Sequence, residues 1–374
     1  MDSVTSDKPT VCLTMIVKNE SKIIERCLDS AKDFIDSVCI TDTGSDDNTP
    51  EIIENWCEQH EIPCKVFHDT FKGFGASRTQ SFKNAIAHFP EADYCLLLDA
   101  DMKLEVIDFD KSELTRASYR LYQYNSGLLY PNTRIISTKY DWKLTTRTHE
   151  FWESPGLKDQ GQIEYEKLRI NDRNDGGCKS DKFERDIKLL KLDINEGIHV
   201  PRNTFYLAQT YKDGNLNRKA IKRYKKRIDL GGWADEIWYS HAMIGKCLLR
   251  IADADDDETA EAEGIRYLLK AFDMKSNRAE PIMELATWYR NKSMNRLAYH
   301  FAKMALECNP KGDLLFVQQS KHTWEPFFEI SIVAFYVNKK KEGLEACNKL
   351  LSDEFEVPDK IKAQVSNNIK FYKS

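Results

Sequence analysis

The chain has 374 residues, a net charge of −5 at neutral pH and a hydrophobic content of 41%. That length suffices for two domains of ordinary size, and the acidic balance argues against a general nucleic-acid-binding protein, which would carry a basic face or tail. The ten cysteines include no CxxC pair, so a zinc module is not expected, and no apolar run is long enough to span a bilayer.

Up to about residue 110, short β-rich apolar runs alternate with segments of helical periodicity. The expected strands cover residues 10–17, 37–43, 64–69 and 94–101, and the expected helices cover residues 19–34, 48–60 and 75–89. Thr49 is expected to cap the second helix, with Pro50 at its first position. This alternation predicts an α/β domain with a Rossmann-like, mostly parallel sheet covered by helices.

The rhythm changes after residue 110. Between about 110 and 195, segments rich in aromatic and β-branched residues predict further strands, interrupted by the polar loop "INDRNDGGCKSDKFERD". From about residue 195 the chain reads as helices. We therefore expect two domains, at residues 8–195 and 196–374.

Two helical segments, at 203–228 and 280–310, share one pattern. Counted from Leu207, the residues Ala208, Tyr211, Ala220 and Tyr224 stand at the same offsets as Ala286, Tyr289, Ala298 and Ala302 do from Leu285. This pattern resembles the helix-turn-helix of tetratricopeptide repeats. Residues 233–275 are expected to form an expanded intervening unit, so the second domain is predicted to be an all-α, tetratricopeptide-like stack.

Polar residues gather where the predicted parallel strands end, and ligands of open α/β sheets bind at that edge. Glu20 follows the first strand, Asp42 ends the second, Arg78 lies near the helix after the third, and Asp99 and Asp101 end the fourth. Residues two apart on a strand face the same side, so Asp99 and Asp101 are expected to converge on one divalent cation. Carboxylate oxygens suit Mg²⁺ or Mn²⁺, which also accept phosphate oxygens.

The other residues of this set suit a nucleotide. Asp42 can accept hydrogen bonds from a ribose or a base edge, and Arg78 can pair with phosphate or orient the acids. Each has a simpler explanation, since Asp42 in "TDTGSDDNT" can organise a turn and a lone arginine on a helix is usually solvated. Their occurrence together and in order favours a nucleotide site.

The sequences "LTMIVKNES", "ITDTGSDDNTPEII", "FGASRTQSF" and "LLLDADM" resemble the family 2 glycosyltransferases of the GT-A fold over roughly residues 10–175. The resemblance implies inverting transfer from a nucleotide-diphosphate sugar, for which we expect a uridine diphosphate sugar. It also implies that Val17, Glu20, Asp42, Arg78 and Asp99 bind this donor, and that Asp99 and Asp101 form a DxD metal site.

Inverting transfer needs a general base that takes the proton of the acceptor. The element "RTHEFW", which resembles the "HE" element of a subgroup that carries tetratricopeptide repeats, offers Glu150 as the base and His149 as a metal ligand. Asp172 and Asp175 are alternatives for the base or for a third metal ligand. Since neighbouring strand residues face opposite sides, His149 and Glu150 are not expected to share one site.

The expected partners are the nucleotide sugar, a protein or glycan acceptor, and a peptide or second copy held by the helical repeats. The absence of a signal peptide in "MDSVTSDKPT" predicts a cytoplasmic chain with reduced cysteines. The alternative function is a catalytically inactive, transferase-like scaffold whose repeats bind a partner. A nucleotidyltransferase is a weaker alternative, because "MIVKNES" is not a Gly-rich phosphate loop.

Overall fold

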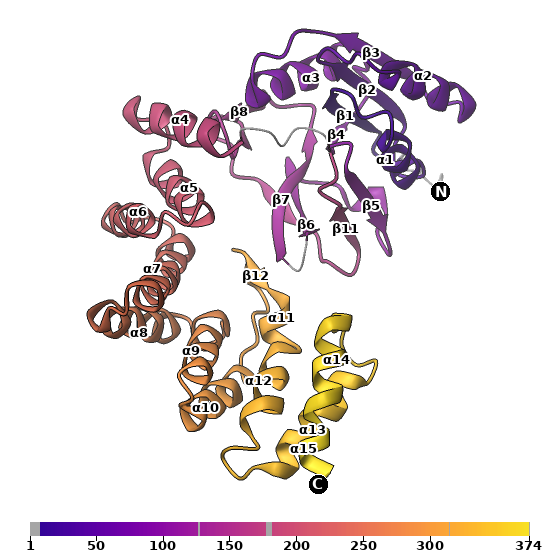
Figure 1. Cartoon of the computed structure of the whole chain (residues 1–374). Helices are drawn as coiled ribbons and strands as arrows, with labels where there is room; N and C mark the ends of the chain where they lie inside the picture. The colour runs from indigo at the N-terminus through magenta and orange to yellow at the C-terminus, as the bar shows by residue number, and fades with distance from the viewer. Residues whose placement is uncertain (1–7, 126–127, 177–181, 314, 374) are drawn as a thin grey trace, which may run out of the picture. The chain divides into compact units, whose positions relative to one another are not determined.

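The computed structural model describes residues 8–125, 128–176, 182–313 and 315–373. The chain divides into two compact units, with the boundary between Ile198 and His199 (Figure 1). Within the described residues, no helix combines the length and the apolar character that crossing a bilayer requires. The nine cysteines in these ranges are free thiols, and Cys178 lies outside them.

The first unit begins with the expected alternation of strands and helices. Its elements are β1 (Val11–Val17), α1 (Ile24–Ala31), β2 (Ser37–Asp42), α2 (Thr49–Gln59), β3 (Cys64–His68), α3 (Phe74–His88) and β4 (Tyr94–Leu97). The prediction for Thr49 is wrong, because Thr49 is the first residue of α2 and Asn48 precedes it as the cap. The Thr49 hydroxyl instead accepts the backbone N–H of Glu20 at 2.9 Å and donates to Asp47 at 2.5 Å.

The later elements of this unit extend the sheet and add a separate hairpin. They are β5 (Met102–Val106), a short 3₁₀ helix (Lys111–Glu113), β6 (Ser118–Asn125), β7 (Leu128–Ser137), β8 (Lys143–Thr145), β9 (Phe151–Glu153), β10 (Gln160–Gln162), β11 (Leu168–Asp172) and α4 (Lys182–Asn195). The strand order is β3-β2-β1-β4-β7-β6-β11-β5. The first four strands are parallel, as predicted, whereas β7 runs antiparallel to both β4 and β6, and β5 antiparallel to β11. The complete sheet is therefore mixed.

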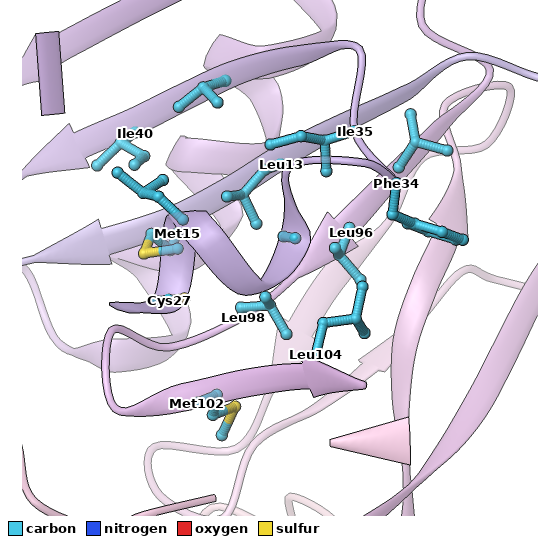
Figure 2. Close-up of a cluster of buried hydrophobic side chains, with 14 of the residues drawn as sticks. Leu13, Met15, Cys27, Phe34, Ile35, Ile40, Leu96, Leu98, Met102 and Leu104 are labelled. Carbon is cyan, nitrogen blue, oxygen red and sulfur yellow. The ribbon is translucent and has the colours of Figure 1, made fainter. Parts of the chain in front are cut away.

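Successive side chains of a strand point to opposite faces of the sheet, and helices cover both faces. In β1, Leu13 and Met15 join a core with α1 and α2 on one face, shown with Leu96 and Leu98 in Figure 2. Cys12 joins a second core with α3 on the other face. Burial on both faces explains why the strands read as continuous apolar runs, and it fixes the register that brings their carboxyl ends to one edge.

The second unit consists of helices, in agreement with the predicted all-α, tetratricopeptide-like stack. They are α5 (Val200–Asp213), α6 (Asn217–Asp229), α7 (Ala234–Asp255), α8 (Glu258–Met274), α9 (Glu280–Asn291), α10 (Asn295–Ala305), α11 (Gln319–His322), α12 (Glu325–Val333), α13 (Lys340–Leu351), α14 (Asp359–Asn368) and α15 (Lys370–Lys373), with the two residues of β12 (Val317–Gln318) before α11.

The shared positions of the repeat pattern are buried in this unit. Leu207, Ala208, Leu285 and Ala286 are fully buried, as expected for positions between packed helices. In the intervening unit, two glycines face each other: a Cβ on Gly245 would lie 2.9 Å from the carbonyl oxygen of Gly264. The close approach of α7 and α8 therefore depends on the missing side chains.

Candidate active site

The acidic turn after β4 is the centre of the site. β4 ends at Leu97, and Asp99 and Asp101 lie in the turn that leads to β5, where the N–H of Met102 donates to the carbonyl oxygen of Asp99 at 3.0 Å. The strand alternation that predicted a common direction for the two acids therefore does not apply to them. Their carboxylates have different neighbours.

Asp99 lies between two arginines. Arg78 Nη2, from α3, donates to Asp99 Oδ1 at 2.5 Å, and Arg134 Nη1, from β7, lies 3.5 Å from Asp99 Oδ2. Burial alone would raise the pKa of Asp99, but the charges of Arg78 and Arg134 outweigh it and hold this pKa below its usual range. Asp99 is therefore an ionised, oriented carboxylate that keeps two guanidinium groups at the strand edge.

Arg134 also connects this pair to the rest of the sheet. It donates to the Leu97 carbonyl at 3.2 Å and to Gln123 Oε1 at 2.9 Å, and Gln123 Nε2 donates to Asp172 Oδ2 at 2.7 Å. Gln123 is almost fully buried. This relay ties the turn after β4 to the end of β11. The Nε of Arg134 is buried and has no hydrogen-bond partner.

Glu150 faces Arg78 from the hairpin loop between β8 and β9. A pocket of about 70 Å³ is lined by Arg78, Asp99, Arg134, Glu150 and Trp152, with residues of β1, β4, β7 and β8 around them. Glu150 Oε2 lies 3.7 Å from Arg78 Nη1, while its Oε1 is buried without a hydrogen-bond partner. Burial raises the pKa of Glu150, although the charge of Arg78 opposes this.

The strand argument about His149 and Glu150 is also wrong, because both residues lie in the loop rather than on a strand. His149 has a left-handed backbone, with a φ of 52°. The loop packs on the start of α3, where a Cβ on Gly75 would lie 3.3 Å from the carbonyl oxygen of Thr146. The missing side chain at Gly75 therefore lets the backbone of this loop lie close to α3.

Asp101 faces a second group of acids. Burial, the charge of Asp99 and the charge of Asp172 all raise the pKa of Asp101. The backbone of Gly176 donates a hydrogen bond to Asp101, and a Cβ on Gly176 would lie 3.2 Å from Asp101 Oδ2 and 3.5 Å from Glu20 Oε1. Glu20, Asp101 and Gly176 thus meet at one point.

The loop that follows β11 is fixed from its other side. Arg26 of α1 forms two hydrogen bonds with Asp175, at 2.8 and 2.7 Å. Asp175 therefore serves this loop as an anchor on α1, while Asp172 accepts from Gln123 and from the N–H of Asn174, at 2.9 Å.

Val17, Glu20 and Asp42 form the rim at the ends of β1 and β2. The Thr43 N–H donates to the Val17 carbonyl at 2.9 Å. Asp42 is buried and accepts from the N–H groups of Gly44 and Ser45, both at 3.2 Å. Asp42 therefore organises the turn at the end of β2, which is the simpler of the two roles expected for it.

The structure thus brings together Arg78, Asp99 and Glu150 in one pocket, and Glu20, Asp101 and Asp172 beside it. Among the described residues, no three His, Cys, Asp or Glu side chains could hold a metal ion by themselves. Asp101 and Asp172 are nevertheless acids whose mutual repulsion a divalent cation would relieve. Mg²⁺ is commonly held by one or two carboxylates together with substrate phosphates, so this donor set fits such a cation.

Sequence reasoning missed Arg134 and Gln123. Both lie on strands of the second half of the sheet, far along the chain from the acidic turn. The one available signal was an arginine next to the apolar residues "II" in "TRIIST", where a buried strand position usually carries an apolar residue.

Comparisons with known proteins identify the family of this chain. The family described as "Glycosyl transferase family 2" matches residues 12–172. Glycosyltransferase SunS of Bacillus subtilis is 33% identical over 375 aligned positions, which cover 90% of this chain and 83% of SunS. A TPR repeat-containing protein of Synechococcus elongatus is 39% identical over 95 residues, covering 25% of this chain; the match spans only 21% of that protein's length.

Among solved structures, S. aureus TarS 1–349 aligns with 78% of this chain and 89% of its own, at 14% identity and a TM-score of 0.33. The match to SunS extends over both units, and the family match runs from Cys12 in β1 to Asp172, the last residue of β11. The chain belongs to glycosyltransferase family 2.

Proposed function

We propose that this chain is a divalent-cation-dependent, inverting glycosyltransferase that moves a sugar from a nucleotide-diphosphate sugar, specifically a uridine diphosphate sugar, to a protein or glycan acceptor. The observation that carries the proposal is the pairing of two chemical environments around the turn after β4. Asp99 forms ion pairs with Arg78 and Arg134, and Glu150 stands in the same pocket as a buried carboxylate with a raised pKa.

The donor would bind along the strand ends. Val17, Glu20 and Asp42 would line the nucleoside side, and Arg78 the diphosphate side, with Arg134 beside it. Two guanidinium groups can form several charge-assisted hydrogen bonds with phosphate oxygens and stabilise the charge that develops on the leaving group.

Asp101 and Asp172 would hold the cation, with Asp99 and His149 as further candidate ligands. When bound, the cation supplies a positive charge for the diphosphate leaving group. Asp99 is the weaker ligand candidate of the DxD pair, because both of its oxygens already face arginines.

Glu150 would act as the general base. A base must be ionised at the working pH and near the acceptor proton, and a raised pKa makes a carboxylate a stronger proton acceptor. Glu150 Oε1 is buried without a partner, whereas both oxygens of Asp172, the alternative base, already accept hydrogen bonds. The Arg78 guanidinium keeps Glu150 oriented toward the pocket.

The test uses the full chain and a set of nucleotide sugars, with Mn²⁺ or with a chelator. We expect one uridine diphosphate sugar to raise the melting temperature only when the cation is present, because a ligand that binds the native state alone stabilises it. That donor should then support turnover, and Asp101→Asn should reduce the turnover at least about 100-fold.

Asp108→Asn, an exposed acid just after β5, is the matched control and should behave as the native chain. Turnover that persists in the chelator would contradict the cation, and stabilisation by a donor with another nucleotide would contradict uridine. If no donor binds or turns over, the alternative of an inactive, partner-binding scaffold is favoured.

A further inference from the structure

The repeat unit holds part of its own chain against its first helices. Residues 315–322, between α10 and α12, include β12 and α11 and lie on the inner side of the arc formed by α5, α7 and α9 (Figure 1). Each of these three helices is the first of its pair. We call residues 315–322 the inner segment.

An aromatic side chain anchors the inner segment. The Phe316 ring stacks on Phe205 of α5, with centroids 6.4 Å apart and an interplanar angle of 10°. It also packs edge-on against Tyr239 of α7, at 5.4 Å. The ring centroids of Phe205 and Tyr239 lie 5.7 Å apart. The two rings form an aromatic slot between α5 and α7, and Phe316 fills it.

The backbone of the inner segment is bound by charged groups that any peptide could use. Arg278, which is fully buried, donates to the carbonyl oxygens of Leu315 at 3.1 Å and of Phe316 at 3.2 Å. Glu280 of α9 accepts the N–H of Gln318 at 3.0 Å. Arg278 and Glu280 are held in place by their own ion pair of 2.7 Å.

Two further side chains of the inner segment contact α9, and His322 Nε2 lies 3.2 Å from Glu280 Oε2. Lys321 Nζ lies 2.5 Å from Glu284 Oε1 of α9, five residues after the aromatic anchor. Phe316, however, has a left-handed backbone, with a φ of 45°, which a bulky L-residue rarely adopts. The inner segment therefore fills the slot at a cost in backbone strain that a separate peptide need not share.

We propose that this face of the repeat unit is a peptide-binding site, and that the inner segment is its built-in competitor. The partner is an extended segment of another protein with an aromatic residue followed five positions later by a basic residue. Its aromatic ring would enter the Phe205–Tyr239 slot, its backbone would bind Arg278 and Glu280, and its cation would reach Glu284. This inference is independent of the proposed sugar transfer.

The inner segment and a free peptide would compete for the same contacts. A tethered segment acts at an effective concentration in the millimolar range for short linkers, so a free peptide binds only in the fraction of molecules whose inner segment is displaced. Weakening the inner segment should therefore strengthen binding of the free peptide without any change in the slot itself.

The experiment uses a labelled peptide that copies residues 315–323, "LFVQQSKHT", and fluorescence anisotropy with the full chain. We expect the Phe316→Ala chain to bind this peptide at least tenfold more tightly than the native chain does. A peptide whose phenylalanine is replaced by alanine should bind neither chain. Tyr336→Ala removes an exposed aromatic residue elsewhere in the unit and should leave the native behaviour unchanged.

Equal affinity of the native and Phe316→Ala chains, or equal binding of the alanine peptide, would overturn the proposal. If Phe316→Ala fails to fold, hydrogen exchange of the native chain decides: excess peptide should speed exchange of the Gln318 amide, and unchanged exchange counts against displacement. A concentration-dependent dimer of the native chain that exchanges inner segments between copies, with no peptide binding, would replace the partner by a second copy.

Discussion

The raised pKa of Glu150 has a direct consequence for activity. A general base works only when it is ionised, so the rate should fall as the pH falls through this pKa, which burial raises above the usual range of glutamate near about 4.3. We expect kcat/KM, measured between about pH 5 and pH 8, to show this acidic limb.

Glu150→Gln should lower kcat/KM by about 10²- to 10⁴-fold and remove the limb from the residual rate. Asp172→Asn is the comparison, since Asp172 is the alternative base. If Asp172→Asn removes the limb while Glu150→Gln retains it, the assignment of the base is wrong.

Arg134 allows a sharper test of the diphosphate side. Its neighbours are Asp99, Gln123 and the Leu97 carbonyl, and it lines the same pocket as Arg78, where its guanidinium charge can act on a phosphate oxygen. Arg134→Met keeps the apolar stem and removes the charge. We expect calorimetry to show about tenfold weaker binding of uridine diphosphate, or about 1.4 kcal/mol, with little change for uridine monophosphate.

Arg116→Met removes an exposed arginine just before β6 and should bind both nucleotides as the native chain does. Arg134→Lys should recover part of the loss, because it restores the charge without the planar fork. Equal weakening of both nucleotides would instead indicate that Arg134 only supports the sheet.

These residues show what sequence can and cannot predict of a site. Asp42, Arg78, Asp99 and Asp101 follow apolar runs or begin a helix, and their positions at strand ends could be inferred from local pattern. Arg134 and Gln123 reach the site only because β7 and β6 pair beside β4. No local pattern reveals a pairing between strands that are distant in the chain, so these two partners stayed hidden.

Among the helices and strands, those with a clear local periodicity were predicted and the irregular turns were not. The expected strands and helices up to β4 are present because their periodicities are local and the burial on both faces is continuous. The strand alternation expected for Asp99 and Asp101 does not apply, since β4 ends two residues before Asp99 and a turn follows it. The β8–β9 loop was read as a strand for a related reason: "TTRTHEFW" is rich in β-forming residues, but His149 takes a left-handed backbone.

In the helical unit, the offsets from Leu207 and Leu285 predicted buried contacts because the helical period repeats them on one face. Gly245 and Gly264 were not part of that pattern, although they allow the closest approach between α7 and α8. The inner segment was also missed. Its contacts with α5, α7 and α9 join residues that are far apart in the sequence.

At the scale of the whole molecule, buried acids respond to their surroundings in two ways. In the first unit, burial raises the pKa of Asp101 and of Glu150, so their ionised forms oppose folding at neutral pH. For Glu284 of the second unit the balance is opposite, as it is for Asp99 of the first. Burial would raise the pKa of Glu284, but the charges of Lys321 and Lys246 outweigh it and lower this pKa to about 2.

A lowered carboxyl pKa stabilises the folded state above the pKa of the unfolded chain, near about 4.3, and this contribution is lost as the pH falls toward the folded value. For Glu284 the shift corresponds to about 3 kcal/mol. Glu284→Gln should therefore lower the urea midpoint of the helical unfolding transition at pH 7, and the difference from the native chain should shrink between pH 5 and pH 3.

Circular dichroism at several pH values follows this transition, because most helices belong to the second unit. Glu345→Gln, at an exposed position of α13, is the matched control and should change stability by less than about 0.5 kcal/mol at every pH. A gap between the Glu284→Gln and native chains that stays constant with pH would mean that Glu284 contributes through packing rather than charge. The ion pairs with Lys246 and Lys321 would then not be what makes the helical unit sensitive to acid.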